Sequence, residues 1–283
     1  MNELDQIKNV FKFLILRNNI KLSIFVLDEM IDCVSTLIEE GIEDTIELMN
    51  VDAVLGVGTK EFVLHYQPIV RLSDRKIVGH EGLVRWLHPI EGMLSPDDFL
   101  NKLSNASLLL LTLEVARIAC EKLQTLDERL WLAINLSPHD IQNRGFLSRF
   151  NNVVDKHGID RTRLRLEITE SAILDEPWMI SVLDSLRQQG FVIEIDDFGT
   201  GYSSLYVIAY YPIAVLKVDK SLLDGIPGDR AKERIYRAVI NMAETLGYEV
   251  IAEGVETKDQ ASWLQFNGCG YGQGYFFGKA GAL

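Results

Sequence analysis

The chain has few cysteines, a deficit of basic residues and no long hydrophobic run, and each shortage excludes a class of protein. Its three cysteines, Cys33, Cys120 and Cys269, are scattered without a CxxC pair. We therefore expect no disulfide framework and a reduced, cytoplasmic location. Lys and Arg number 28 against 41 Asp and Glu, a formal net charge of −13. This balance argues against a polynucleotide bound over a broad basic surface.

Membrane and export signals are also missing from the sequence. The apolar run Leu108–Leu113 is far shorter than the roughly 20 residues that span a bilayer. The N-terminus has no cleavable signal pattern. A chain of 283 residues with 47% hydrophobic residues is long enough to bury a sizeable core, so we expect a soluble globular protein with no membrane span.

Residues 1–55 are predicted to form a helical extension. Apolar residues recur at helical spacing, and Gly41 stands where a helix would end; the apolar face comprises Leu27, Met30, Ile31, Val34, Leu37 and Ile38. The segment Val54–Thr59 breaks the pattern and marks the boundary to a second domain at residues 60–283. The extension is expected either to pack on that domain or to mediate dimerisation.

From residue 60 onward, short strand patterns alternate with amphipathic helical patterns. The predicted strands are Phe62–Gln67, Ile77–Trp86, Trp131–Ser137, Leu164–Thr169, Phe191–Asp196, Val215–Asp219, Glu249–Val255 and Tyr271–Phe276. The predicted helices include Leu108–Leu123, Phe146–His157, Trp178–Gln189 and Ala231–Leu246. This order predicts an α/β fold, a modified TIM-like (β/α)8 barrel. The connection between Gln67 and Ile77 is too short for a crossover helix, so the first strand is predicted to be antiparallel.

A doubly wound open sheet is the competing architecture. The glycine-rich phosphate loop that such folds often carry after their first strand is missing.

Polar residues interrupt otherwise apolar strands near their carboxyl ends, where the strands of such a barrel converge on one mouth. They include six residues with side-chain oxygens, at Glu81, Asn135, Glu167, Asp196, Asp197 and Glu253. Burying so many carboxylates requires cations. An all-oxygen donor set favours Mg²⁺ or Mn²⁺, and six donors suit two ions bridged by one carboxylate, an arrangement used in phosphoester hydrolysis. Lys217, at the same mouth, is expected to hold the attacking water or neutralise developing charge.

The motifs on these strands resemble the EAL domain family of cyclic di-GMP phosphodiesterases over residues about 60–280. The matching stretches are Tyr66-Gln-Pro-Ile69, Glu81-Gly-Leu-Val-Arg-Trp86, His88-Pro89, Asn135-Leu-Ser137, Glu167-Ile-Thr-Glu170, Asp196-Asp-Phe-Gly-Thr-Gly-Tyr-Ser-Ser-Leu205, Leu216-Lys-Val-Asp219, Ala252-Glu-Gly-Val-Glu256 and Gln273-Gly-Tyr275.

The resemblance implies a role for each matching residue. Glu81, Asn135, Glu167 and Asp196 would hold the first divalent cation, and Asp196, Asp197 and Glu253 the second, with Lys217 on the nucleophilic water. Substrate would be bound by Gln67, the backbone at Leu83, Arg85 and Gln273. Glu170 would anchor the loop Phe198–Leu205, which in the family couples dimerisation to metal binding. The implied reaction opens cyclic di-GMP to pGpG in a homodimer, with Ca²⁺ inhibitory.

Two departures from the family pattern bear on the site. Gly82 replaces the alanine of the signature Glu-Ala-Leu triplet and is expected to point outward, away from the site. Glu194 adds a carboxylate inside the barrel, paired with Arg165 or Lys217, and is expected to tune metal affinity. Two other readings remain open beside the enzyme: a module that binds the dinucleotide without cleaving it, and a protein-binding adaptor whose barrel is only a scaffold.

Overall fold

The computed structural model describes residues 61–88, 90–103, 105–143, 145–170, 177–200, 208 and 210–283. The chain divides into two compact units, Met1–Gly58 and Thr59–Leu283. The predicted helical extension at residues 1–55 lies outside the described residues, and its helices stay a prediction.

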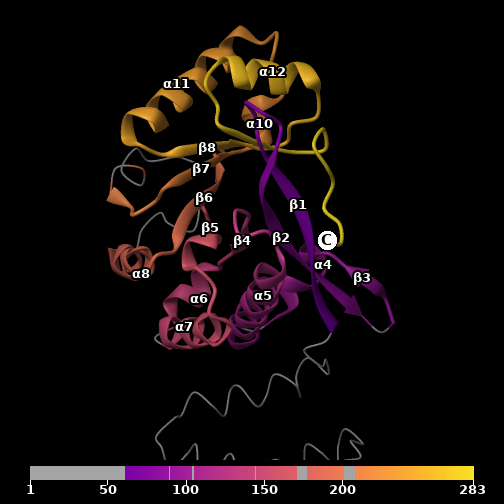
Figure 1. Ribbon diagram of the computed structural model, residues 1–283, viewed down its shortest axis with the longest axis vertical. Coiled ribbons are helices and arrows are strands. Elements are labelled where there is room, and N and C mark those ends of the chain that lie inside the picture. Colours follow the sequence, from indigo (N-terminus) through magenta and orange to yellow (C-terminus); the bar gives the residue numbers. More distant parts are fainter. Residues whose placement is uncertain are drawn as a thin grey trace, which may run out of the picture. The chain divides into compact units, whose positions relative to one another are not determined.

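The second unit is a closed barrel of eight strands (Figure 1). Around the barrel these are β1 (Phe62–Arg71), β9 (Tyr271–Gln273), β8 (Glu249–Ala252), β7 (Val215–Val218), β6 (Val192–Phe198), β5 (Leu164–Thr169), β4 (Trp131–Asn135) and β2 (Ile77–His88). β1 closes the ring by pairing antiparallel with both β2 and β9, while the other pairs within the ring are parallel. The predicted modified barrel with an antiparallel first strand is confirmed.

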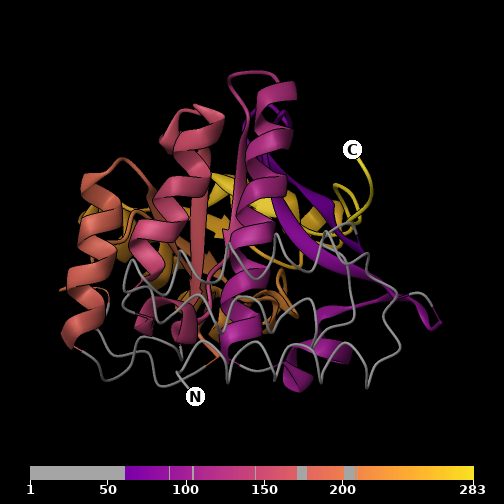
Figure 2. The same ribbon diagram turned by 90° about the horizontal axis from the view of Figure 1, so that it is seen from below.

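Helices lie outside the strands along most of the barrel, leaving much of β1 uncovered, as Figures 1 and 2 show. The longer ones are α5 (Asn105–Thr125), α7 (Phe146–His157), α8 (Pro177–Gln188), α11 (Arg230–Leu246) and α12 (Lys258–Phe266). Shorter pieces are α4 (Pro96–Phe99), α6 (Pro138–Gln142), α10 (Lys220–Leu223) and the 3-10 turns η2 (Leu100–Lys102) and η3 (Arg161–Arg163). Of the helices in the described ranges, none combines the length and apolar character that crossing a membrane requires.

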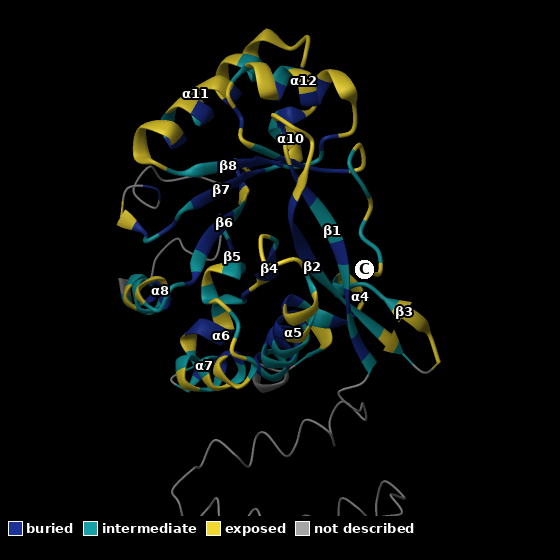
Figure 3. Ribbon diagram, in the orientation of Figure 1, coloured by how far each residue is buried: buried dark blue, intermediate teal, exposed yellow. Residues whose placement is uncertain are grey.

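Strand alternation separates two environments in the barrel. Side chains that point inward at mid-height form a compact apolar cluster, which includes Ile69, Ala133, Val215 and Ile251. Outward side chains such as Leu132 and Ile134 are fully buried beneath the helices, whose far faces are exposed (Figure 3). Polar side chains inside the barrel are therefore cut off from solvent except at its ends.

Most predicted elements lie where the sequence placed them, and two coincide with the structure, at Leu164–Thr169 and Phe146–His157. Four strands were predicted too long at their carboxyl ends. Two of these end because a polar residue caps a new helix: Ser137 accepts a hydrogen bond at the start of α6, and Asp219 at the start of α10. The other two run into Gly254 and Gly274, which have φ values of 63° and 153°.

Several short elements were not predicted, and neither were the strand β3 and the helix α12. The strand β3 (Gly92–Leu94) extends the sheet by a hairpin from β2. The helix α12 begins with a capping box between Thr257 and Gln260, a pattern that is visible in the sequence.

Gly82 points away from the barrel interior, as expected. A Cβ atom there would lie 3.3 Å from Leu64 Cδ1 and 3.6 Å from Ile134 Cγ2, both on the outer face. The departure from alanine at this position therefore changes the packing under the helices and leaves the barrel mouth untouched.

Candidate active site

Polar side chains gather at the carboxyl-terminal mouth of the barrel. Asn135 and Gln273 are the last residues of their strands, and Glu253 directly follows β8. Glu167, Asp196 and Lys217 lie within β5, β6 and β7, and Glu81 lies within β2. Because parallel strands end at the same rim, residues far apart in the sequence converge there.

Lys217 lies at the centre of this group and is completely buried. Its Nζ atom is 2.8 Å from Asp196 Oδ1, 2.9 Å from Glu167 Oε1, 3.0 Å from Glu253 Oε1 and 3.7 Å from Glu81 Oε2. Burial alone would lower the pKa of the ammonium, but the surrounding carboxylates raise it well above its ordinary value. Lys217 is therefore a fixed positive charge among four acidic side chains.

The single ammonium does not balance these acids. Burial, and then the neighbouring charge of Glu81, raise the pKa of Glu167 well above its ordinary value, and burial raises the pKa of Glu253 to about 8. Carboxyl groups in this state gain most from additional positive charge. The all-oxygen donor set and the excess of buried acid fit hard divalent cations.

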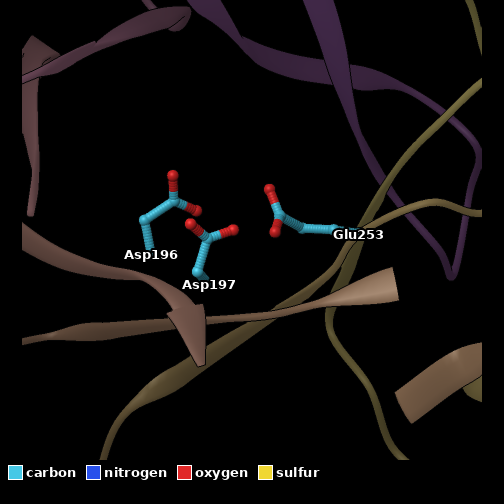
Figure 4. A group of neighbouring side chains, drawn as sticks. All are labelled: Asp196, Asp197 and Glu253. Atoms are coloured by element: carbon cyan, nitrogen blue, oxygen red, sulfur yellow. The ribbon is translucent and has the colours of Figure 1, made fainter. Parts of the chain in front are cut away.

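Asp196 and Asp197 face the same space because the strand is irregular there. The pairing of β6 with β7 shifts register between Ile195 and Phe198, and Asp197 has a φ of 56°. Both features break the alternation that would send adjacent side chains to opposite faces. Carboxylate oxygens of Asp196, Asp197 and Glu253 all lie within 4.8 Å of one another, and Figure 4 shows the Glu253 carboxylate directed toward the aspartates. This trio is a candidate cation site.

Amide side chains connect the acids to the first strand. Asn135 Nδ2 donates to Glu81 Oε1 at 3.3 Å and to Glu167 Oε2 at 3.2 Å. Gln273 Nε2 donates to Glu81 Oε2 at 2.5 Å and to Gln67 Oε1 at 3.1 Å. These bonds hold the Glu81 carboxylate toward the other acids.

A pocket of about 300 Å³ opens beside this network. Its lining contains five of the residues expected at the site: Gln67, Glu81, Leu83, Glu253 and Gln273. Arg85 is not in this lining, and its Nη1 donates to the Val84 carbonyl at 2.8 Å. The structure therefore brings together the predicted cation-binding residues and Lys217, with three of the predicted substrate residues, Gln67, Leu83 and Gln273, beside them.

Glu170 contacts the start of the loop that follows β6. Its Oε2 atom accepts a hydrogen bond of 3.0 Å from the backbone N–H of Gly199. The remainder of that loop, residues 201–205, lies outside the described residues.

Apart from two glycines, three pocket residues were missed by sequence reasoning: Lys220, Glu256 and Tyr275. Lys220 and Glu256 form an ion pair of 2.5 Å across the pocket wall. Each of the three lies two or three residues beyond a predicted site residue on the same strand end. These residues could have been found by extending the search from the last residue of each strand into the turn that follows it.

Comparison with known proteins identifies the family to which these motifs point. The EAL domain profile matches residues 52–280. The chain is 39% identical over 223 residues to the cyclic di-GMP phosphodiesterase NbdA of Pseudomonas aeruginosa, covering 76% of this chain and 28% of that protein. It is 37% identical over 226 residues to an uncharacterized signaling protein of Caulobacter vibrioides, covering 79% of this chain and 28% of that protein. The chain thus spans under a third of the length of these relatives.

Solved structures agree in fold. The PaMucR phosphodiesterase in complex with c-di-GMP superposes with a TM-score of 0.73 at 31% identity, covering 83% of this chain and 96% of that one. The cAMP-bound form of the EAL enzyme Bd1971 gives a TM-score of 0.74 at 30% identity, covering 94% of this chain and 75% of that one.

Proposed function

The chain belongs to the EAL domain family, and on this basis we propose that it is a phosphodiesterase that hydrolyses cyclic di-GMP to linear pGpG with the help of divalent cations. The observation that carries the proposal is the cluster of four carboxylates around buried Lys217 at the mouth of the barrel. Relatives and neighbours named for this substrate support the assignment.

Two groups of side chains are assigned to the cations, Mg²⁺ or Mn²⁺. Glu81, Asn135, Glu167 and Asp196 would hold one, and Asp196, Asp197 and Glu253 the other. Bound there, the cations would supply positive charge that acidifies water and stabilises a negatively charged phosphate.

The protein's own groups do the remaining work. Lys217 holds the reacting water or neutralises developing charge, since its ammonium is already fixed within 3.0 Å of three site carboxylates. Gln67 and Gln273 face the pocket and are assigned to the substrate, together with the backbone at Leu83. Arg85 is assigned to the phosphate, using guanidinium donors other than the one that contacts the Val84 carbonyl.

Product analysis tests the proposal directly. The full chain is incubated with cyclic di-GMP in Mg²⁺ or Mn²⁺, and the products are separated by chromatography, with chelator and Ca²⁺ as controls. We expect pGpG to appear only with Mg²⁺ or Mn²⁺. Tight binding without any product would replace the enzyme by a sensor of the dinucleotide, and absence of both would leave an adaptor whose barrel is a scaffold.

Removal of the Glu170 carboxylate should weaken the site without removing a cation ligand. Glu170→Ala deletes the acceptor for the Gly199 N–H, which frees the start of the loop next to Asp197. We expect a loss of turnover of about tenfold and a higher Mn²⁺ concentration for half-maximal rate. Glu170→Gln, which keeps an acceptor oxygen, is the control and should lose less. Equal metal dependence in Glu170→Ala and the unaltered chain would refute the anchoring role.

A homodimer is also proposed, on the family resemblance of the loop after β6. Sedimentation velocity at micromolar concentration checks it. A fully active monomer under these conditions would overturn the proposal.

A further inference from the structure

One charged group inside the barrel has no place in the proposed chemistry. Glu194 is completely buried, and of the two partners expected from the sequence it contacts Arg165, with 3.0 Å between Arg165 Nη1 and Glu194 Oε1. Among the residues that the structure describes, its other carboxylate oxygen, Oε2, has no hydrogen-bond partner. A buried carboxylate oxygen without a hydrogen bond destabilises the folded protein unless another group stabilises its negative charge.

Register places Glu194 beside the cation site. Glu194 on β6 is paired with Glu167 on β5, so the two side chains point to the same face of neighbouring strands, which lie about 4.8 Å apart. Glu194 also stands two residues before Asp196 on the same strand face. Its carboxylate is therefore next to Glu167 and one layer below Asp196.

Arg165 fixes this carboxylate from beneath. The guanidinium carbon lies 3.8 Å from the centre of the Trp131 ring, and Nη1 is shared between Glu194 and Glu249, at 3.0 and 3.1 Å. Stacking and two ion pairs leave the guanidinium little freedom. Glu249 is 42% exposed whereas Glu194 is fully enclosed, so of the two acids that share Arg165 only Glu194 lies in the dry interior.

We propose that Glu194 is a positioning residue of the cation site: held by Arg165, it places a buried negative charge beside Glu167 and Asp196 and so strengthens the binding of divalent cations. The inference rests on the proposed cation site. Charges interact more strongly inside a protein than in water, so one added charge in the neighbouring layer changes affinity measurably.

Calorimetric titration of the metal-free full chain with Mn²⁺ tests this inference. Glu194→Gln keeps the shape and an acceptor for Arg165 but removes the charge, and we expect the dissociation constant for Mn²⁺ to rise about tenfold. Glu249→Gln removes one charge from the same guanidinium at the exposed side, and its affinity should stay within about twofold of the unaltered chain. In turnover assays, Glu194→Gln should need more Mn²⁺ for half-maximal rate while reaching the same maximal rate.

A double variant separates charge from shape. Arg165→Gln combined with Glu194→Gln removes both charges, and Mn²⁺ affinity should return to within about threefold of the unaltered chain. It also keeps the test open if Glu194→Gln alone folds poorly. The inference is overturned if Glu194→Gln binds Mn²⁺ normally, if Glu249→Gln is equally weakened, or if the double variant shows the full loss. Mn²⁺ binding by the unaltered chain without any turnover would instead refute the proposed hydrolysis and leave this inference intact.

Discussion

Asp196→Asn is expected to lower the turnover of cyclic di-GMP at least about 1000-fold while the barrel still folds. Asp196 is assigned to both cations, and its Oδ1 also accepts a hydrogen bond of 2.8 Å from Lys217. The amide keeps the shape of the side chain but carries no charge, so both cation positions and the lysine lose a partner. Initial rates at saturating Mn²⁺ measure the loss of turnover, and a far-ultraviolet circular dichroism spectrum shows whether the barrel still folds.

A matched control is available on the same chain. Asp224 is exposed and follows α10, so Asp224→Asn removes a charge from the surface and should leave turnover unchanged. If Asp196→Asn retained more than a tenth of the activity with a normal fold, Asp196 could not be the shared ligand. The assignment of two cations would then have to be abandoned.

Lys217→Met is expected to destabilise the metal-free protein by about 3–5 kcal/mol, because it leaves several buried carboxylates without their shared cation. For a domain of this size the melting temperature should fall on the order of 10 °C in chelator. Mn²⁺ should restore much of the loss, since ligands that bind only the folded state stabilise it. Turnover should stay low even in Mn²⁺, because the assigned role of the ammonium is missing.

Lys220→Met provides the comparison for this experiment. Its ion pair with Glu256 lies at the surface, with the lysine side chain 47% exposed, and such pairs contribute little to stability. We expect the melting temperature of Lys220→Met in chelator to stay close to that of the unaltered chain. A Lys217→Met protein as stable in chelator as Lys220→Met would show that Lys217 is not the counter-ion of the site.

The barrel was predictable because its signals are local. Hydrophobic period and polar residues at strand ends identified the eight strands, and the short connection before Ile77 revealed the antiparallel pair. The position of the site was predicted from the same pattern, because polar residues at the carboxyl ends of apolar strands all lie at one mouth of a closed barrel. Even the convergence of Asp196 and Asp197 was inferred, although the left-handed backbone at Asp197 could not be.

The missed features depend on contacts between segments that are distant in the sequence. The choice between Arg165 and Lys217 as the partner of Glu194 was left open, because strand register decides it. That Arg165 also pairs with Glu249 gave no sequence signal. The pocket residue Tyr275 lies in a turn that forms around Gly274, where a Cβ atom would come within 2.3 Å of the Val255 backbone. Such close approaches depend on the folded structure, and the glycine is the only sign of them in the sequence.

The way the barrel closes also determines when the polar cluster at its mouth is complete. Gln273 reaches back over 192 residues to Glu81 and over 206 to Gln67, across the seam where β1 meets β9. Contacts of such long range form late, because the intervening chain must already be ordered to bring them together. In a chain that is still being synthesised, the acidic side chains are therefore not yet held together at one mouth. The hydrogen bonds from Gln273 to Glu81 and Gln67 can form only after β9 has paired with β1, so the polar cluster is complete only at the end of barrel folding.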